Sequence, residues 1–551
     1  MKQLQARVDI APSVARRDVE GKLGAVSPIP LTHTQQRAWF LAQLDPLSTA
    51  YNEARAHRLV GPLNHAALKQ ALGCLIERHE MLRTTVSMVG HEPMQQLRHD
   101  MPLAFECTDL SSHPQGAREQ DLQAALNAWC QEPFDLTLGP LVRFRVVRLA
   151  DSEHVLLRTW HHIVTDGWSV GVFERELSLL YEALVSGRAA PLTALPIQYA
   201  DYALWQRRWL AGPLLQQQLS YWKRQLADLS TLALPTDRPR PAMQSDRGAV
   251  LSVALPAQLA QRLRALARAE GTTLFMAGLA AFKVLLYRYS GTTDVAVGTP
   301  IAGRGRTELE GLIGFLANTL VLRTDLSGHL SFRALLARVR ECALNAYTHQ
   351  DLPFERLVEE LAPARDLSRN PLFQVCFALH DAAGPGLTLH GLQVQPIELP
   401  SGHAKFDLSL DLRERDGTLH ACLEFCTELF EHATIARMAE HFTVLLAAIV
   451  EDPEQCIDAL PLMSAAERQR ILVQFNDTAR PYPKNVSLAA LFQAQVQRSP
   501  QACALVHDAT TLTYAQLNQQ ANRLAHHLID LGVHPEVPVA ICMHRSPDLI
   551  T

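Results

Sequence analysis

The segment WHHIVTDGWS holds the residues of this sequence that are best suited to chemistry. It contains two adjacent histidines, His161 and His162, and Asp166 follows four positions after the second of them. Histidine titrates near neutral pH, so it can accept or donate a proton during a reaction. The segment is therefore the main candidate for an acid–base site.

Asp166 and Gly167 have separate roles in this pattern. The Asp166 carboxylate can orient an imidazole, or it can pair with an arginine and brace the loop. Gly167 allows a backbone conformation that a side chain would obstruct. An isolated pair of histidines is more often buried and hydrogen-bonded than catalytic, but the complete spacing HHxxxDG favours a functional site.

Two strands and a helix are expected to position this segment. Residues 141–149 alternate between apolar and basic, which predicts a half-buried strand, and a returning strand is predicted over 154–160. Apolar residues at helical spacing predict a helix over 169–186, and Gly187 suits its C-terminus. The histidines thus lie at a strand end before a helix, where backbone N–H groups can hold an anion.

Other patterns in the sequence favour structure over chemistry. A second histidine pair, His526 and His527, has a different spacing to its aspartate and glycine and lies within a helical pattern. Residues 290–293 (SGTT) lie between a helix and a strand, so they predict a turn rather than a phosphate loop. Cys422 and Cys426 lack a histidine or a second cysteine pair at zinc spacing, so we expect no metal site and reduced thiols.

Composition and charge narrow the classes of function. The 551 residues are 48% apolar and 19% charged, which is a globular composition, and the formal charge is −5. No basic excess is available to neutralise phosphates, so nucleic acid is not an expected partner. The N-terminus lacks a signal-peptide core, and the longest apolar stretches are shorter than about 20 residues. We therefore expect no membrane partner and a cytoplasmic location.

The chain divides into several units. A Pro-rich break at 234–241 separates two segments of mixed helices and strands, which fit two α/β lobes of about 200 residues each. The further helices and strands expected in the lobes lie at 64–80, 256–270, 273–289, 294–299, 319–323 and 375–379. After about residue 460 a helix and a Pro-rich linker precede another unit.

The last unit opens near Val486 with a helix. It continues with a strand over 502–507, a helix over 514–531 and a strand over 537–543. It has only about 65 residues, too few to bury the core of a large α/β domain, so we expect a fragment of a longer domain.

Seven motifs occur in a fixed order and include the histidine segment. They are LTHTQQRAWFLAQLDP (31–46), RHEMLRTT (78–85), HHIVTDGWS (161–169), YADYALW (199–205), IGFLANTLVLR (313–323), HQDLPFE (349–355) and RDLSRNPLFQ (365–374). In this order they resemble the condensation domain of a nonribosomal peptide synthetase. A further motif, LTYAQLN (512–518), resembles the first motif of the adenylation domain that follows in this family. The resemblance covers roughly residues 28–550.

The resemblance implies a fold and a set of domains. The expected fold is α/β: two chloramphenicol-acetyltransferase-like lobes in a V-shaped pseudodimer with a central tunnel, followed by a truncated start of an adenylation domain. The domains that it implies are a leader or docking segment (1–27), the condensation N-lobe (28–205), the C-lobe (206–460), a linker (461–485) and the adenylation fragment (486–551).

For function, the resemblance implies an acyltransferase that forms peptide bonds. The amine of a carrier-bound aminoacyl group would attack a peptidyl, aminoacyl or acyl thioester on an upstream carrier. The partners implied are donor and acceptor peptidyl carrier domains and the remainder of the adenylation domain. No cofactor is expected on this chain itself, because 4′-phosphopantetheine would arrive on the carriers.

The same resemblance suggests which residues act on the substrates. His162 would face the centre of the tunnel and serve as a base or as a positioning group for the attacking amine. The Gly167 N–H would meet the oxyanion at the positive end of the following helix.

Other residues are expected to support this site. His161 would order the loop, and Asp166 would pair with an arginine, either Arg304 as the first candidate or Arg83 as the second. The residues expected to line the tunnel are Trp168, Ser169, Asn318 and Gln350.

Two other functions stay open. A starter condensation domain would acylate an amino acid from a fatty acyl-CoA or acyl carrier, which agrees with a sequence that begins at Met1 without a preceding carrier. A non-catalytic docking platform would recruit other enzymes, although such relatives usually lose part of the HHxxxDG block. Other relatives fit less well: plant-type acyltransferases carry a DFGWG motif that is missing here, epimerisation domains follow a carrier domain, and heterocyclisation domains replace the histidines with aspartates.

Overall fold

The computed structural model describes residues 14, 16, 29–363, 366–380, 386–399, 402–415 and 417–551. The chain forms two compact units, Met1–Ala466 and Glu467–Thr551. The leader predicted for residues 1–27 lies outside the described residues apart from Val14 and Arg16. The first unit contains two α/β lobes, each with its own sheet.

The first lobe is built on a five-stranded sheet with the order β12-β2-β7-β6-β5. In that order the strands span Gln393–Ile397, Asn52–Val60, Glu153–His161, Val142–Ala150 and Phe105–Asp109. β6 and β7 pair antiparallel, which confirms the two strands predicted to lead to the histidines.

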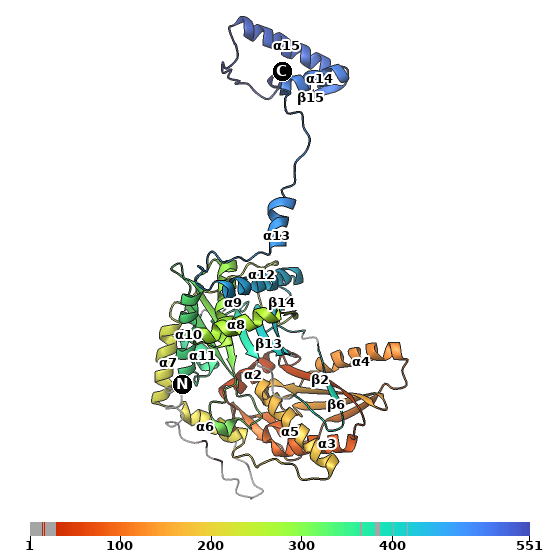
Figure 1. Ribbon diagram of the computed structural model, residues 1–551, viewed down its shortest axis with the longest axis vertical. Coiled ribbons are helices and arrows are strands. Elements are labelled where there is room, and N and C mark those ends of the chain that lie inside the picture. The colour runs from red at the N-terminus through yellow and green to blue at the C-terminus, as the bar shows by residue number, and fades with distance from the viewer. Residues whose placement is uncertain are drawn as a thin grey trace. The chain divides into compact units, whose positions relative to one another are not determined.

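Helices cover both faces of this sheet (Figure 1). The helices α3 and α5 lie on one face and α4 on the other; they span His65–Arg78, Gly167–Ser186 and Gln115–Cys130. Phe144 and Val146 of β6 belong to the core under α3 and α5, whereas Val147 and Leu149 belong to the core under α4. Successive side chains of a strand point to opposite faces, so β6 is buried on both faces.

The prediction of a half-buried strand was therefore wrong for the centre of β6. The sequence suggested that its arginines face water, but Arg145 is buried. Its guanidinium donates to Glu106 Oε2 at 2.9 Å and to Glu132 Oε2 at 2.7 Å, so partners inside the protein replace the expected water. The helix α4 shields this face, and the sequence gives no local sign of that cover.

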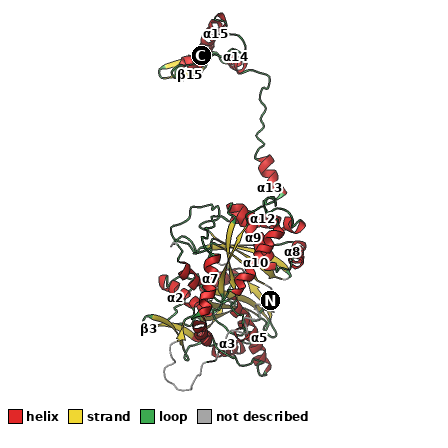
Figure 2. Cartoon of the chain, turned by 90° about the vertical axis from the view of Figure 1, so that its left-hand side faces the viewer, coloured by secondary structure: helices red, strands yellow, loops and turns green. Residues whose placement is uncertain are grey.

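The second lobe has a six-stranded sheet with the order β10-β9-β11-β13-β14-β8. In that order the strands span Asn318–Asp325, Asp294–Ile301, Val375–His380, Leu408–Arg415, Thr418–Cys426 and Gly248–Ala254. Figure 2 shows this sheet among four helices: α8 (Ala257–Ala269), α9 (Leu274–Ser290), α10 (Phe332–Thr348) and α12 (His432–Glu451). All the helices and strands predicted for this lobe are present.

One strand belongs to the second lobe by sequence and to the first by pairing. β12 follows β11 along the chain, but it pairs antiparallel with β2, with Gln393 opposite Val60 and Ile397 opposite Ala56. The lobe boundary predicted at residue 205 does not show that β12 joins the sheet of the first lobe. The two lobes therefore share main-chain hydrogen bonds as well as side-chain contacts.

The helix α12 must be compared with the prediction that the chain has no membrane-spanning segment. It has 20 residues and a mean hydropathy of 1.5, so length and composition alone would allow it to cross a membrane, contrary to that prediction. However, its residues Ile435, Phe442 and Leu446 lie in the core of the second lobe. A core helix meets the same criteria, so packing accounts for its apolar composition.

The second unit is small. It contains α14 (Leu488–Arg498), β15 (Cys503–His507), β16 (Thr510–Thr513), α15 (Tyr514–Asp530) and α16 (Pro547–Ile550). The strand predicted over residues 537–543 is absent from this unit, because an apolar stretch becomes a strand only where another strand pairs with it. Val539 and Ile541 in that stretch are largely exposed.

A lysine lies inside the core of the second lobe. Lys283 of α9 has no exposed surface, and its ammonium donates to the carbonyl oxygens of Val295 (2.9 Å) and Leu322 (2.5 Å) and to Thr324 Oγ1 (3.0 Å). Burial lowers the pKa of Lys283 to about 8, because removal from water disfavours the charged form. The side chain thus ties α9 to β9 and β10.

We predict a pH dependence of stability from Lys283. Above pH 8 the folded protein loses a proton that the unfolded chain keeps up to about pH 10. The free energy of unfolding, taken relative to Lys283→Met, should therefore rise by about 1.4 kcal/mol per pH unit across this window. Urea unfolding of both proteins at several pH values measures this difference.

The control for this prediction is Lys223→Met, because Lys223 is partly exposed and pairs with Glu360 at 3.0 Å. It should leave the slope unchanged. A difference between wild type and Lys283→Met that stays flat from pH 8 to about 10 would contradict the role of Lys283.

Candidate active site

The two histidines lie where β7 ends against β2. His161 is the last residue of β7, opposite Asn52, and His162 opens a short 3₁₀ turn, His162–Val164, that leads to α5. The backbone N–H of His162 donates to the Tyr51 carbonyl at 2.8 Å. The register of two central strands therefore fixes the point from which both side chains leave the backbone.

A hydrogen bond to the backbone determines which nitrogen of His162 carries the proton. His162 Nδ1 lies 2.7 Å from the carbonyl oxygen of Thr165. A carbonyl oxygen only accepts hydrogen bonds, so Nδ1 must be the donor. In the neutral ring Nε2 is then unprotonated and available as an acceptor. The His162 side chain keeps 14% of its surface exposed, so this acceptor is not sealed in the core.

The surroundings of His162 favour its neutral form. Burial lowers its pKa below the usual value, and the Lys405 charge acts in the same direction. The Glu53 and Asp166 carboxylates and the bond to Thr165 oppose this effect without cancelling it. The ring packs at 4.2 Å, between centroids, against Phe315 of the second lobe. At neutral pH His162 is therefore an uncharged base.

His161 has a different environment. Its side chain is buried between the rings of Tyr51 and Phe134, each 6.2 Å away, and its Nδ1 accepts from the Ile163 N–H at 3.1 Å. Burial lowers the pKa of His161 to about 3, with smaller effects from His162 and Lys405. His161 stays neutral and holds the turn, which agrees with the predicted loop-ordering role.

The Asp166 carboxylate is buried and saturated with hydrogen bonds. Its Oδ1 accepts from the Ser169 N–H and hydroxyl at 2.9 and 2.7 Å, so Asp166 caps α5. Its Oδ2 accepts from the N–H groups of Leu316 and Ala317 at 2.9 and 3.1 Å. Asp166 thus joins the start of α5 to a loop of the second lobe.

Arg304 completes this arrangement. Its guanidinium donates to both Asp166 oxygens, at 2.8 and 3.0 Å, and both side chains are only 1% exposed. This is the pairing that the sequence favoured first. Arg83, the second candidate, contacts His99 and the Glu77 carbonyl instead, so the structure contradicts its predicted support of the site.

The backbone at Gly303, just after β9, lies very close to the loop whose Leu316 N–H donates to Asp166. Gly303 has a φ of +67°, and a Cβ on it would lie 1.9 Å from the Leu316 carbonyl oxygen. Only glycine fits such a position without moving the backbone. This close approach delivers Arg304, the next residue, to Asp166.

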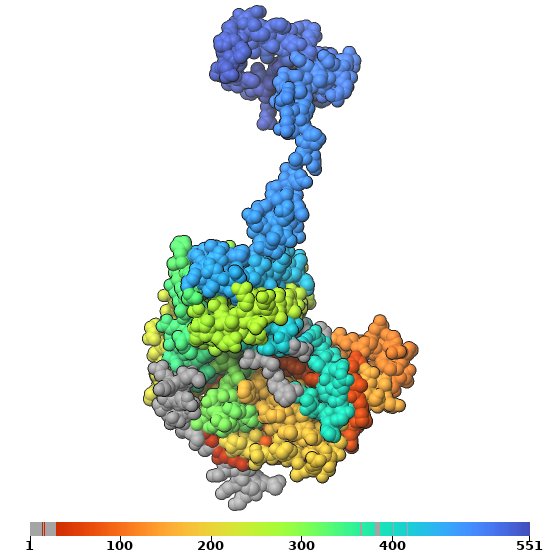
Figure 3. Space-filling model, viewed as in Figure 1, coloured from red at the N-terminus to blue at the C-terminus, as the bar shows by residue number. Residues whose placement is uncertain are grey.

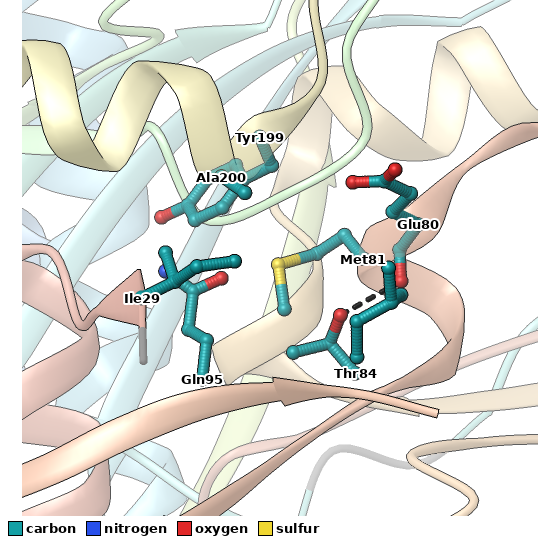
Figure 4. Close-up of a pocket in the computed structure, with 8 residues that line it drawn as sticks. Ile29, Glu80, Met81, Thr84, Gln95, Tyr199 and Ala200 are labelled. Atoms are coloured by element: carbon teal, nitrogen blue, oxygen red, sulfur yellow. Dashed lines mark hydrogen bonds between the residues drawn. The ribbon is translucent and has the colours of Figure 1, made fainter. Parts of the chain in front are cut away.

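Tyr199 also holds this loop, through a hydrogen bond to its backbone. Its hydroxyl donates to the Phe315 carbonyl at 2.8 Å and lies 3.1 Å from Thr32 Oγ1. Figure 4 shows Tyr199 at a small pocket beside Met81 and Thr84, where the Thr84 hydroxyl donates to the Glu80 carbonyl. His162 is not among the residues that line this pocket. The pocket therefore belongs to the packing beneath the site.

The space-filling view shows a recess between the two lobes, with residues of the first third of the chain, coloured red, at its floor (Figure 3). Access to His162 is indicated by its exposed fraction and by the neighbouring Lys405, which is exposed. The central tunnel that the sequence predicts stays a prediction.

Gly167 differs from its prediction. Its φ is not positive, and a Cβ built on it meets no atom within 4 Å, so no steric rule of the backbone requires glycine there. What the missing side chain provides is open space at the first turn of α5. The N–H groups of that turn have no acceptor within the helix. Among the described residues, no acceptor for the Gly167 N–H is found.

Ser169 and Trp168, both expected to line the tunnel, contact the second lobe, and the lining role of Trp168 stays a prediction. Ser169 is fully buried; its hydroxyl accepts from the Gly314 N–H at 3.1 Å, so it cannot line an open space and that prediction was wrong. Trp168 is 47% exposed, and its Nε1–H donates to the Glu310 carbonyl at 2.9 Å. The start of α5 is thus fastened to the second lobe at several points.

Asn318 anchors a loop. Its side-chain amide donates to the carbonyls of Gln350 (3.0 Å) and Leu352 (2.8 Å), and its oxygen accepts from the Phe354 N–H (3.0 Å). Backbone groups therefore satisfy the amide, and the predicted lining role of Asn318 stays a prediction. For Gln350 only the backbone carbonyl takes part in these contacts, and its lining role stays a prediction.

Glu53 is a residue of this site that the sequence did not reveal. Its Oε1 lies 3.7 Å from His162 Nε2, and its side chain is 25% exposed. It belongs to β2 and lies opposite Trp160, one position before the histidines. No sequence motif marks Glu53, because only the pairing of β2 with β7 brings it to His162.

One cluster of possible metal ligands lies elsewhere in the second lobe. Ligand atoms of His329, Cys456 and Asp458 lie within 4.8 Å of one another. These groups already contact one another, and Tyr287 donates to Asp458 at 2.6 Å. Cys422 and Cys426 belong to β14 (Thr418–Cys426), and all ten cysteines of the chain are free thiols.

Two protein families match the chain. The condensation domain family matches residues 27–472, and the family of AMP-binding enzymes matches residues 492–551. The first match covers both lobes and the site built around His162. The second coincides with the predicted adenylation fragment.

Known relatives are large synthetases. The chain is 44% identical to chondramide synthase cmdD of Chondromyces crocatus over 97% of its own length, but it covers only 14% of that protein. It is 41% identical to phosphinothricin tripeptide synthetase PhsC of Streptomyces viridochromogenes, with 98% of this chain and 49% of that protein covered. The chain thus spans about half of one relative and a small part of the other.

Solved structures share the fold. The X-domain in complex with OxyB from teicoplanin biosynthesis has a TM-score of 0.73 and 31% identity, and the match covers 82% of this chain and 99% of that one. A four-domain nonribosomal peptide synthetase bound to AMP and glycine has a TM-score of 0.80 and 24% identity, with 94% and 40% covered. At that identity the likeness shows the fold alone.

We predict that the Asp166–Arg304 pair stabilises the first unit. Asp166→Ala should lower its free energy of unfolding by about 3–5 kcal/mol, because it leaves a buried, unpaired guanidinium. The same change in an Arg304→Ala background should cost much less. Urea unfolding of the four proteins gives the coupling between the two residues.

Asp109→Ala is the matched control, since Asp109 pairs with Arg148 on the surface. It should change the unfolding midpoint very little, because an ion pair that stays in water contributes little to stability. An Asp166→Ala midpoint equal to that of wild type would contradict the structural role of the pair.

Proposed function

The chain belongs to the condensation domain family of nonribosomal peptide synthetases, followed by the start of an AMP-binding domain, and we propose that it joins two carrier-bound substrates through an amide bond. Condensation domains are acyltransferases that form peptide bonds. The predicted fold, a pseudodimer of chloramphenicol-acetyltransferase-like lobes, is confirmed by the family match and the solved structures. We infer the substrates and partners of this chain from its site.

One observation carries the proposal. His162 Nδ1 donates to the Thr165 carbonyl, so Nε2 of this ring, whose side chain is 14% exposed, is left as a proton acceptor. The lowered pKa of His162 keeps that nitrogen unprotonated at neutral pH. This is the state that an attacking amine requires of a base or of a hydrogen-bond acceptor.

The proposed reaction needs one proton transfer from the amine to the leaving sulfur. The acceptor amine has a usual pKa of about 8, so part of it is neutral near pH 7. Its nitrogen attacks the thioester carbonyl carbon while an N–H proton passes to His162 Nε2. The C–S bond then breaks, and the leaving thiolate takes the proton from the imidazolium. Positioning of the two reactants contributes alongside this proton transfer.

The oxyanion of the tetrahedral intermediate is assigned to the start of α5. The Gly167 N–H belongs to the first turn of that helix, and a helix N-terminus carries a partial positive charge. A donor placed where negative charge develops lowers the barrier, because it costs no rearrangement during the reaction. The open space beside Gly167 supports this assignment.

The proposed partners are donor and acceptor carrier domains and the remainder of the adenylation domain. The carriers would bring their substrates on 4′-phosphopantetheine arms through a central tunnel between the lobes. We propose a cytoplasmic location for this assembly. The domain boundaries at 28–205, 206–460, 461–485 and 486–551 are part of the same proposal.

A docking platform is the second candidate function. In its favour is the likeness to an X-domain solved in complex with OxyB. Against it stands a histidine with a defined tautomer, a lowered pKa and a free acceptor nitrogen, which a purely binding surface does not need. A starter condensation domain would use the same site with an acyl donor.

The two candidates are distinguished by turnover. The chain is mixed with an acceptor carrier loaded with an amino acid and a donor carrier loaded from a panel of N-acetylaminoacyl or fatty acyl groups, and the acceptor carrier is analysed by intact mass. We expect acyl transfer to the acceptor. Binding of loaded carriers without transfer for any donor would support the docking platform instead, and transfer only from fatty acyl donors would identify a starter domain.

We predict that His162→Ala lowers the rate of transfer by about 10²–10⁴-fold, the usual contribution of a general base. Because the ring is only 14% exposed and packs against Phe315, its removal should lower the melting temperature by a few degrees, so rates are compared at a temperature where both proteins are folded. His526→Ala, in the other histidine pair, is the control and should retain full activity. Normal turnover by a folded His162→Ala protein would remove this histidine from the mechanism.

Gly167→Ala tests the oxyanion assignment. The added methyl group meets no protein atom within 4 Å, so the melting temperature should stay within about 1–2 °C of wild type. It enters the space that we assign to the thioester oxygen, so we expect the transfer rate to fall by about 10-fold or more. Unchanged activity would show that this space is not used by the substrate.

A further inference from the structure

Two hydrogen-bond acceptors of the site, one on His162 and one on Glu53, lie near each other. His162 Nε2 and Glu53 Oε1 lie 3.7 Å apart. That distance is too long for a direct hydrogen bond, for which N···O distances are about 2.7–3.2 Å. Because His162 Nδ1 already donates to Thr165, neutral His162 has no proton to offer Glu53. The two atoms therefore present a pair of unused acceptors.

The charges around Glu53 keep its carboxylate ionised. Burial raises the pKa of Glu53, but His162 in its protonated form and the charges of Arg55, Lys405 and Arg413 together lower it below its usual value. Arg55 Nη1 approaches the other carboxylate oxygen, Oε2, at 3.8 Å, so Oε1 is left for His162. Among the described residues, no hydrogen-bond donor to Oε1 is found.

The separation of the two acceptors fits one nitrogen atom. An amine nitrogen about 2.9 Å from each acceptor would point one N–H at each, with both bonds bent by roughly 20° from linear. Hydrogen-bond angles above about 150° are favourable, so both bonds would be good. The nitrogen lone pair would then point away from both acceptors, free to attack a carbonyl carbon.

We propose that Glu53 Oε1 and His162 Nε2 form a two-acceptor site that binds the primary amine of the acceptor substrate by its two N–H groups. This inference rests on the proposed condensation reaction and names what selects its nucleophile. As the C–N bond forms, the N–H proton at Nε2 passes to His162, while Glu53 keeps its hydrogen bond and stays ionised. The new imidazolium faces the Glu53 carboxylate until the leaving thiolate takes the proton.

This site selects between nucleophiles. A neutral primary amine has two N–H groups and satisfies both acceptors, whereas a secondary amine or a hydroxyl has one hydrogen to donate. With a hydroxyl, the Glu53 carboxylate would lose its water without gaining a hydrogen bond, which is costly. Loss of a needed hydrogen bond is a strong source of discrimination between substrates.

The first test uses Glu53→Gln in the full chain. The acceptor carrier is loaded with glycine, with N-methylglycine or with glycolic acid, and each donor of the panel that wild type accepts is used. We expect kcat/KM for glycine to fall by about 5- to 10-fold, because the uncharged amide oxygen of glutamine still accepts the second N–H but holds it about half as strongly as a carboxylate. The preference for glycine over glycolic acid should shrink by several-fold, because only the amine uses the second acceptor. An unchanged preference would overturn the proposal.

The double variant and a matched control show where the effect arises. Adding Glu53→Gln to His162→Ala should cost less than it costs in wild type, since the two residues bind one nitrogen. Glu119→Gln removes a carboxylate that pairs with Arg58 on the surface and should change neither rate nor preference. Independent, additive losses at Glu53 and His162 would contradict a shared site.

The second test needs no turnover. The ¹⁵N signals of His162, assigned by their loss in His162→Gln, report its tautomer and its titration. The groups that act on this ring are Lys405, Glu53 and Asp166. Since the Glu53 charge favours the imidazolium, Glu53→Gln should move the His162 midpoint to lower pH, and the acid limb of kcat/KM should move with it. A midpoint that does not move would overturn the pairing.

These tests separate the inference from the proposed function. If wild type transfers no acyl group, or if His162→Ala retains full activity, the proposed function fails. If His162→Ala loses activity while Glu53→Gln keeps the rate, the preference and the His162 midpoint of wild type, only the two-acceptor site fails. A loss of rate in Glu53→Gln with unchanged preference would leave Glu53 with a structural role and would also overturn the inference.

Discussion

The buried pair of Asp166 and Arg304 is the constraint on which the site depends. It joins a helix start in one lobe to a loop of the other, with both charges removed from water. Such a pair is tolerated only when every lone pair and proton finds a partner, because desolvation of two ions is costly. Here the backbone of Leu316 and Ala317 and the Ser169 hydroxyl supply the remaining partners. The lobes are thus held together by a polar network and not only by apolar contact.

That network determines the surroundings of His162. The loop fixed by Asp166 carries Phe315, which packs against the His162 ring, and Tyr199 holds the same loop through the Phe315 carbonyl. The ring is therefore enclosed by both lobes, and this burial is the main cause of its lowered pKa. The way the lobes meet therefore lowers the pKa of this base below the value of about 6.5 that an exposed histidine has, and so reduces the fraction of the ring that is protonated at pH 7.

The sequence predicts well what depends on neighbours along the chain. Periodicity was enough for α5 and for the pairing of β6 with β7, and Arg304 was the first candidate as the partner of Asp166. Prediction from the sequence fails where segments that are far apart along the chain come into contact. Ser169 was expected in a tunnel wall, but it is buried because the Gly314 loop covers it. The stretch 537–543 has strand composition, yet no strand of the second unit pairs with it.

Glu53 shows most clearly why some functional residues escape sequence reasoning. Nothing near it in the chain distinguishes it from a surface acid at the start of a strand, and strand alternation does not reveal what lies across the sheet. Its position next to His162 arises from the register of β2 against β7. Its lowered pKa comes mainly from His162 in its protonated form and from Arg55, with smaller effects of Lys405 and Arg413 in the other lobe. The first lobe therefore sets the spacing of the two acceptors, and the second lobe adds two of the charges and the Phe315 contact, so the chemistry of the site depends on the complete two-lobed unit.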